Sequence, residues 1–145
     1  CAVTGARMRG VPTSMAICAA AMEDGWTDET EVIALHDARR GQLIASPYVI
    51  TKGVLRPGAD ATVIQPDELL DREDAAFVTC QGDVVLPLVP DSVKSSLVIL
   101  DHVPASCFFG LGEGTAASID EIPEPVYVRP AVFVKPRPVR AMTAG

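Results

Sequence analysis

Two side chains near position 105 are of the types that form a nucleophile and a base. Cys107 carries a thiol, and His102 carries an imidazole that can accept its proton. Asp101 cannot orient His102 from the adjacent position of a strand, because consecutive strand side chains point to opposite faces. Pairing also requires the chain to fold back through Val103 and Pro104. We therefore retain Cys107 and His102 as candidate catalytic residues, with a plain strand end as the alternative.

The first residue, Cys1, is another candidate nucleophile. An N-terminal cysteine places a thiol beside a free amine, and the two can act together as nucleophile and base. The alternative interpretation is a chain whose leading residues have been trimmed, in which Cys1 has no chemical role.

A glycine-rich loop follows Cys107. Backbone amides of such a loop can cradle a phosphate at the start of a helix. Here no lysine precedes Thr115, as a Walker loop requires, and Glu113 places a carboxylate inside the expected anion site. We expect either a weak ligand-binding loop or an ordinary surface loop, and its candidate binding residues are Gly110, Gly112 and Gly114.

The cysteines and histidines lack the spacing of a metal site. Four cysteines at positions 1, 18, 80 and 107 include no Cys-x-x-Cys pair, and the sequence has only two histidines. We predict no metal and no cofactor. Cys18 and Cys80 have apolar neighbours, where a reduced thiol packs as a small hydrophobic group, although four cysteines also permit disulfides.

Charge is unevenly distributed along the chain. The formal net charge is −7, yet no carboxylate occurs from Val126 onward. An acidic chain argues against nucleic-acid binding, and no apolar run is long enough to span a bilayer. The basic end could lie on the acidic surface of another copy or of a larger assembly, or fold back on its own body. Its candidate interface residues are Arg129, Lys135, Arg137 and Arg140.

Helix signals are concentrated in the first forty residues. Apolar residues share one face between Met15 and Met22, Thr13 or Ser14 can cap the segment, and Gly25 can end it. Residues 27–40 begin with acidic and end with basic residues, which favours a second helix. The consecutive apolar residues within 31–36 leave a buried strand as the competing interpretation.

Short β-branched segments dominate the chain after position 42. Proline and glycine separate them, which is typical of strands and turns, and prolines such as Pro47 belong at sheet edges or bulges. Asp67 could cap a single helical turn. The expected strands cover residues 43–45, 48–51, 61–64, 76–79, 84–89, 96–100 and 126–134.

Together these patterns predict a β-rich α+β fold. We expect one or two N-terminal helices followed by a small antiparallel β-sandwich or open barrel. The expected organisation is an arm over residues 1–12, one globular domain over 13–135 and a basic, proline-rich arm over 136–145.

Three functions are consistent with these sequence patterns. Terminal arms and opposite charges in body and tail favour a non-enzymatic structural or assembly subunit, of a particle-coat or decoration type, that forms a homo-oligomer. The first alternative is a small enzyme, or enzyme subunit, with Cys1, or Cys107 with His102, as its reactive group. The second is a small-ligand binding module. The absence of a charged segment leading into an apolar one argues against a signal peptide, so we expect a soluble protein without a targeting segment.

Overall fold

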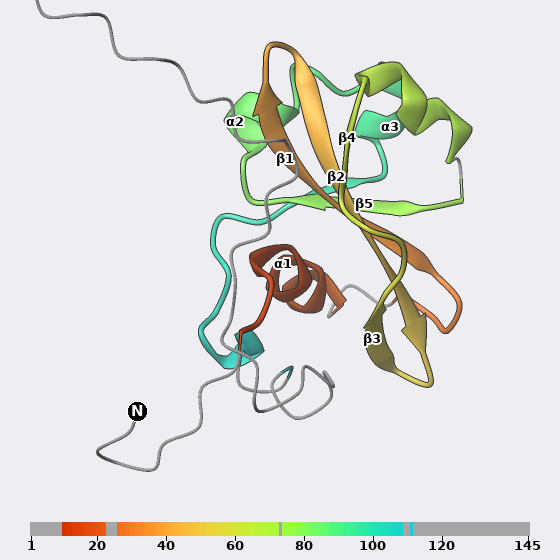
Figure 1. Ribbon diagram of the computed structural model, residues 1–145, viewed down its shortest axis with the longest axis vertical. Helices are drawn as coiled ribbons and strands as arrows, with labels where there is room; N and C mark the ends of the chain where they lie inside the picture. The colour runs from red at the N-terminus through yellow and green to blue at the C-terminus, as the bar shows by residue number, and fades with distance from the viewer. Residues whose placement is uncertain (1–9, 23–25, 73, 109–110, 112–145) are drawn as a thin grey trace, which may run out of the picture.

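The chain forms an open, mixed β-sheet with helices on both faces (Figure 1). The computed structural model describes residues 10–22, 26–72, 74–108 and 111. A helix followed by a six-stranded sheet confirms the predicted β-rich α+β class. In chain order the elements are α1 (Thr13–Ala21), β1 (Glu31–Arg39), β2 (Gln42–Thr51), β3 (Val54–Pro57), β4 (Thr62–Ile64), η2 (Pro66–Asp71), β5 (Ala76–Thr79), α2 (Gly82–Val85), α3 (Asp91–Lys94) and β6 (Leu97–Ile99).

The sheet combines an antiparallel and a parallel half. Its strands are ordered β3-β2-β1-β5-β6, and β4 also pairs with β2. Strands β1, β2 and β3 form consecutive antiparallel hairpins, whereas β5 runs parallel to β1 and β6 parallel to β5. The sheet is therefore a single, open, mixed sheet, where the sequence suggested an antiparallel sandwich or barrel.

Strand β1 occupies the segment for which the sequence favoured a second helix. Its residues Val32 to Leu35 are fully buried one after another, because β1 lies inside the sheet and both of its faces are covered. The competing strand interpretation was right and the helix interpretation was wrong. Gly41, directly after this segment, lies in the turn between β1 and β2.

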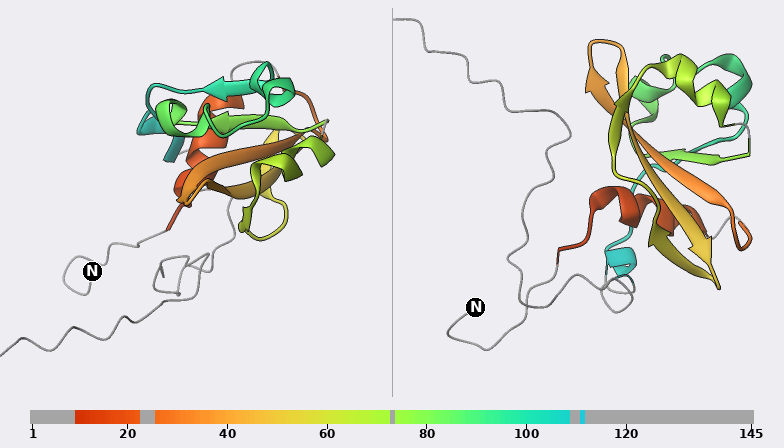
Figure 2. Two further views of the ribbon diagram at one scale, coloured as in Figure 1. Left: turned by 90° about the horizontal axis from the view of Figure 1, so that it is seen from above. Right: turned by 45° about the vertical axis from the view of Figure 1, so that its right-hand side comes forward.

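Helix α1 covers one face of the sheet (Figure 2). Its buried Met15, Ile17 and Cys18 pack in one cluster with side chains that point to the same face of β1, such as Val32 and Ala34. The predicted helix at this position is confirmed, but its N-cap is Pro12, with no side-chain cap hydrogen bond, where the sequence suggested Thr13 or Ser14.

The short helices η2, α2 and α3 cover the opposite face. Leu69, Val85 and Val93, one from each, join a core cluster with Ile33 and Phe77 of the sheet. The expected strand over residues 84–89 is wrong, because this segment begins inside α2 and continues as turns. The helical turn expected at Asp67 is present as η2, although Gln65 rather than Asp67 is its N-cap.

Pro47 lies within β2 without breaking the sheet. It is paired with Ile33 of β1 on one side, and its carbonyl oxygen accepts a hydrogen bond from the Gly58 nitrogen at 3.0 Å on the other. The proline nitrogen faces the side of its carbonyl, between the segments of β2 that pair with β3 and with β4. The missing N–H therefore costs no ladder bond, which agrees with the expectation that the prolines sit at breaks in pairing.

Among the described residues, no helix has the length and apolarity needed to cross a bilayer.

Candidate functional site

The two described candidate catalytic residues do not form a hydrogen-bonded pair. His102 is exposed after the end of β6. Cys107 is partly buried in a short helical segment, and its nitrogen donates to the Pro104 oxygen at 3.1 Å. Within the part of the chain that the structure describes, no hydrogen bond links the Cys107 thiol to the His102 ring. Their assignment to catalysis stays a prediction.

The other candidates from the sequence lie outside the described residues. They are the N-terminal nucleophile, the three loop glycines and the four basic interface residues: Cys1, Gly110, Gly112, Gly114, Arg129, Lys135, Arg137 and Arg140.

The Cys18 thiol has a structural environment. It is fully buried between α1 and the sheet, and this burial raises its pKa to about 12. A thiol needs its deprotonated form to act as a nucleophile, so Cys18 is unreactive near neutral pH. The expectation that it packs as a small hydrophobic group agrees with this environment.

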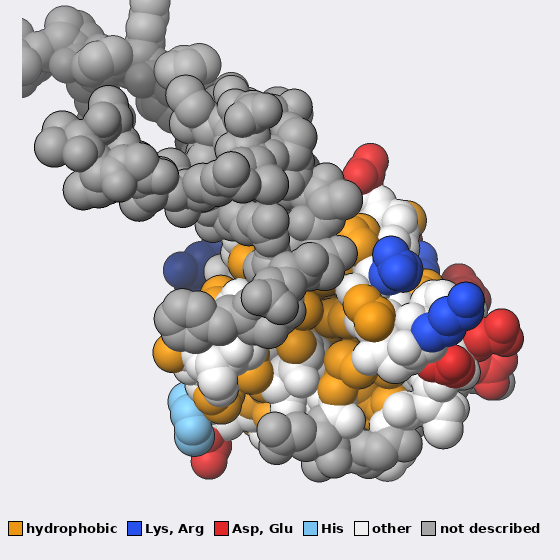
Figure 3. Space-filling view, turned by 90° about the horizontal axis from the view of Figure 1, so that it is seen from below, with side chains coloured by type: hydrophobic (Ala, Val, Ile, Leu, Met, Phe, Trp, Pro, Cys, Tyr) orange, Lys and Arg blue, Asp and Glu red, His pale blue; other side chains and the backbone are white. Residues whose placement is uncertain are grey.

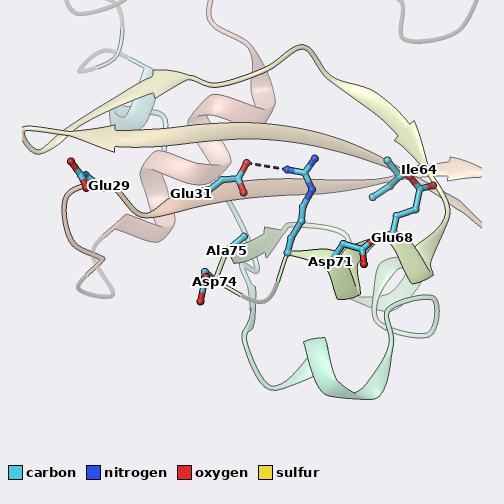
Figure 4. A pocket seen from close by; sticks show the side chains of 8 residues that line it. Glu29, Glu31, Ile64, Glu68, Asp71, Asp74 and Ala75 are labelled. Atoms are coloured by element: carbon cyan, nitrogen blue, oxygen red, sulfur yellow. Dashed lines mark hydrogen bonds and ion pairs between the residues drawn. The ribbon is translucent and has the colours of Figure 1, made fainter.

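The described part of the chain has an acidic cavity of about 610 Å³, shown in Figure 4. It lies between η2 and the segments that lead into β1 and β5. Eight residues line it: Glu29, Glu31, Ile64, Glu68, Asp71, Arg72, Asp74 and Ala75.

The elements around the cavity fix the positions of its carboxylates. Glu29 has a positive φ of 70°, and its backbone nitrogen donates to the Ile50 oxygen at 2.8 Å, which holds the segment before β1 against β2. Glu68 belongs to the capping box of η2, where its Oε1 accepts a hydrogen bond from the Gln65 nitrogen at 2.6 Å. Glu31 is the first residue of β1.

One cation partly offsets the negative charge of the cavity. The Arg72 Nη1 atom donates to the Glu31 Oε1 atom at 3.0 Å, and both side chains are about 40% exposed, at 42% and 38%. Ion pairs with this exposure contribute little to stability. Five carboxylates and one guanidinium leave an excess of four formal negative charges around the cavity.

Such a cavity is suited to an organic cation. An ammonium or guanidinium group can donate hydrogen bonds to several carboxylates at once. Within the described ranges, no group of three or more His, Cys, Asp or Glu side chains is arranged to hold a metal ion.

The sequence alone did not predict that these residues line one cavity. The acidic residues are visible as two separate runs, one containing Glu29 and Glu31 and the other containing Glu68, Asp71 and Asp74. They meet because β5 pairs in parallel with β1, so that the segment entering β5 lies beside the start of β1. The two acidic runs were the available signal, but their contact depends on long-range pairing.

Comparison with known proteins reveals a likeness to solved structures. Neither a protein-family model nor a curated protein matches the chain. A solved structure with a similar fold, TM-score 0.50 and 20% sequence identity, is described as "an uncharacterized protein with similarity to peptidase YEAZ from Pseudomonas aeruginosa". The match covers 80% of this chain and 56% of that protein, so the chain spans just over half of its length.

This likeness corrects the functional expectation drawn from the sequence. The fold resembles a protein of the YeaZ-like kind, so the interpretation as a particle-coat, decoration or virion subunit is wrong. That interpretation relied on terminal arms and charge distribution, features that many kinds of protein share.

Proposed function

We propose that this chain is part of a YeaZ-like protein that binds a peptide or protein segment. A basic side chain of that bound segment enters the acidic cavity. The observation that carries the proposal is the cavity itself, which is lined by acidic residues from two distant runs of the sequence. The likeness to a structure described as similar to a peptidase supports the ligand class, because peptides are what a peptidase-like protein handles.

The dimensions and charge of the cavity are consistent with this ligand. A volume of about 610 Å³ lies within the range of sites that hold small organic groups. A lysine or arginine side chain would bring one positive charge into a space with a fourfold negative excess. Arg72 already shows that a guanidinium is accommodated there, since it pairs with Glu31 at 3.0 Å.

The described residues favour binding over cleavage. Peptide hydrolysis by a thiol needs a nucleophile within hydrogen-bond reach of its base. Cys18 is deeply buried with a raised pKa, and Cys107 forms no hydrogen bond with His102 within the described ranges. The acidic cavity, by contrast, is already assembled.

Calorimetry with two matched peptides tests the proposal. The first is a short alanine peptide with one central arginine, and the second carries citrulline, which has the same shape without the charge. We expect the arginine peptide to bind about tenfold more tightly, and Asp71→Asn with Asp74→Asn to remove most of that difference. Asp60→Asn is the matched control, because Asp60 is exposed and lies outside the cavity.

Equal affinity for the two peptides would overturn the proposal. The same conclusion would follow if Asp60→Asn weakened binding as much as the paired change at Asp71 and Asp74, because charge in general would then be responsible rather than the cavity.

A further inference from the structure

Arg72 brings a positive charge of the chain's own into the acidic cavity. Of the eight residues that line the cavity in the described part of the chain, Arg72 alone is a cation. Its Nη1 atom donates to the Glu31 Oε1 atom at 3.0 Å, which joins the C-cap of η2 to the first residue of β1. The chain therefore supplies the same kind of group that the cavity is proposed to bind.

The backbone of Arg72 is held independently of this ion pair. The Arg72 nitrogen donates to the Leu69 oxygen at 3.2 Å at the end of η2, and the Arg72 oxygen accepts from the Ala75 nitrogen at 3.1 Å just before β5. Leu69 is fully buried in the core cluster on this face of the sheet. The Arg72 side chain can thus leave Glu31 and turn toward solvent while the backbone around it keeps its hydrogen bonds.

The ion pair lies between carboxylates of the cavity. In Figure 4 the dashed line starts at Glu31, with Asp74 on one side of it and Asp71 on the other. A basic side chain that enters this part of the cavity therefore meets a carboxylate that already has a cationic partner, and it competes with the Arg72 guanidinium for Glu31.

The exposure of the ion pair makes Arg72 replaceable. The Arg72 and Glu31 side chains are 42% and 38% exposed. Pairs with this exposure add little stability, because water and salt screen the charges and both side chains lose freedom. A ligand ammonium or guanidinium can donate to the same carboxylate and so replace Arg72 at small cost, whereas a neutral side chain of the same shape brings no charge to compensate for the broken pair.

We propose that Arg72 is an internal competitor, which occupies Glu31 until a basic side chain of the ligand displaces it. This inference rests on the proposed function of the cavity and adds the regulation of that site. Arg72 keeps the affinity for basic ligands below the value that the five carboxylates alone would give.

Calorimetry of Arg72→Gln with the arginine and citrulline peptides tests the competition. We expect the variant to bind the arginine peptide about fivefold more tightly, because Glu31 is then free and one repelling charge is absent. Its affinity for the citrulline peptide should stay as in the unaltered chain. Its melting temperature should change little, because the lost ion pair is exposed.

Two controls separate competition at Glu31 from a general effect of charge. Arg40→Gln removes an exposed arginine from the turn between β1 and β2, at the opposite end of β1 from Glu31, and should leave the affinity unchanged. When Glu31→Gln is already present, adding Arg72→Gln should improve binding of the arginine peptide by less than about twofold, because the contested carboxylate is gone.

Unchanged or weaker binding of the arginine peptide by Arg72→Gln would overturn the competition, as would an equal gain with and without Glu31→Gln. A clear fall in melting temperature for Arg72→Gln would show that the ion pair serves the fold, and would also count against the competition. In these cases a preference of the unaltered chain for the arginine peptide leaves the proposed function intact. Equal affinity of the unaltered chain for the two peptides would overturn both, because Arg72 then has no ligand to exclude.

Discussion

His36 is a titratable residue placed where its charged form is costly. It lies on β1, opposite Ile44 of β2, and burial lowers its pKa below the ordinary value for histidine. The unfolded chain binds a proton at His36 more readily than the folded chain does. The contribution of His36 to stability is therefore complete above pH 6.5 and is lost as the pH falls toward its folded-state pKa.

Replacing His36 should make the protein less sensitive to mild acid. We expect His36→Gln to show a smaller fall in unfolding free energy between about pH 7.5 and pH 5.5, with a difference below about 1.4 kcal/mol per pH unit. Urea denaturation at several pH values measures it. His102→Gln, which removes an exposed imidazole, is the control substitution. Identical profiles for His36→Gln and the unaltered chain would show that His36 does not couple protonation to folding.

For a single residue, the sequence gives the type of side chain but not the residues that surround it in the fold. Cys18 and Cys107 are both cysteines in the sequence, yet one is buried with a pKa raised to about 12 and the other is partly exposed. The apolar neighbours of Cys18 correctly indicated burial. Reactivity depends on the packing of α1 against β1, which the local sequence does not specify.

The short helix α2 and the short strand β6 are in close contact, and this contact helps to position both elements. A Cβ atom added to Gly82 would lie 2.6 Å from the Cγ2 atom of Ile99, well inside normal contact distance. Gly82 therefore allows the start of α2 to approach the edge strand closely, a role for glycine that concerns space rather than backbone angle.

Gly82→Ala should destabilise the protein by about 1–3 kcal/mol through this clash. Combining it with Ile99→Ala should remove most of that penalty, because the clashing methyl group is then absent. Urea denaturation of the two single variants and the double variant gives the coupling free energy. An equal cost of Gly82→Ala in both backgrounds would show that the Ile99 contact is not responsible.

Local patterns predicted helices and strands correctly wherever the sequence favoured only one of the two structures. The helix of residues 13–21 follows from apolar residues that share one face, and the strands around 43–51 and 76–79 follow from β-branched segments. The helix prediction for residues 27–40 was wrong because it relied on acidic residues at the start and basic residues at the end, a pattern that complements a helix dipole. The buried middle of this segment is instead a strand that is covered on both faces. Only the position of β1 inside the sheet separates the two interpretations.

The whole molecule is defined by pairing that no local pattern specifies. The sequence predicts a β-rich α+β domain, but the parallel pairing of β5 with β1 joins segments more than forty residues apart. That placement brings the two acidic runs to one cavity and the Gln81 side chain to the backbone of Asp37 in β1. The candidate site could therefore not be assembled from the sequence, although its residues were visible there.

The molecule carries opposite charges at two places that the sheet holds apart. The acidic cavity lies beside the starts of β1 and β5, whereas Arg39 and Arg40 lie where β1 ends. The likeness to a YeaZ-like structure, at 20% identity, concerns the fold alone. The ligand therefore has to be tested at the cavity itself.

Amide hydrogen exchange with the arginine and citrulline peptides tests that claim most directly. We predict that the arginine peptide slows exchange in η2 and in residues 74–76, which border the cavity, and that the citrulline peptide leaves these amides unchanged. Slowed exchange confined to other elements, or the same pattern with both peptides, would contradict binding of a basic side chain in the acidic cavity.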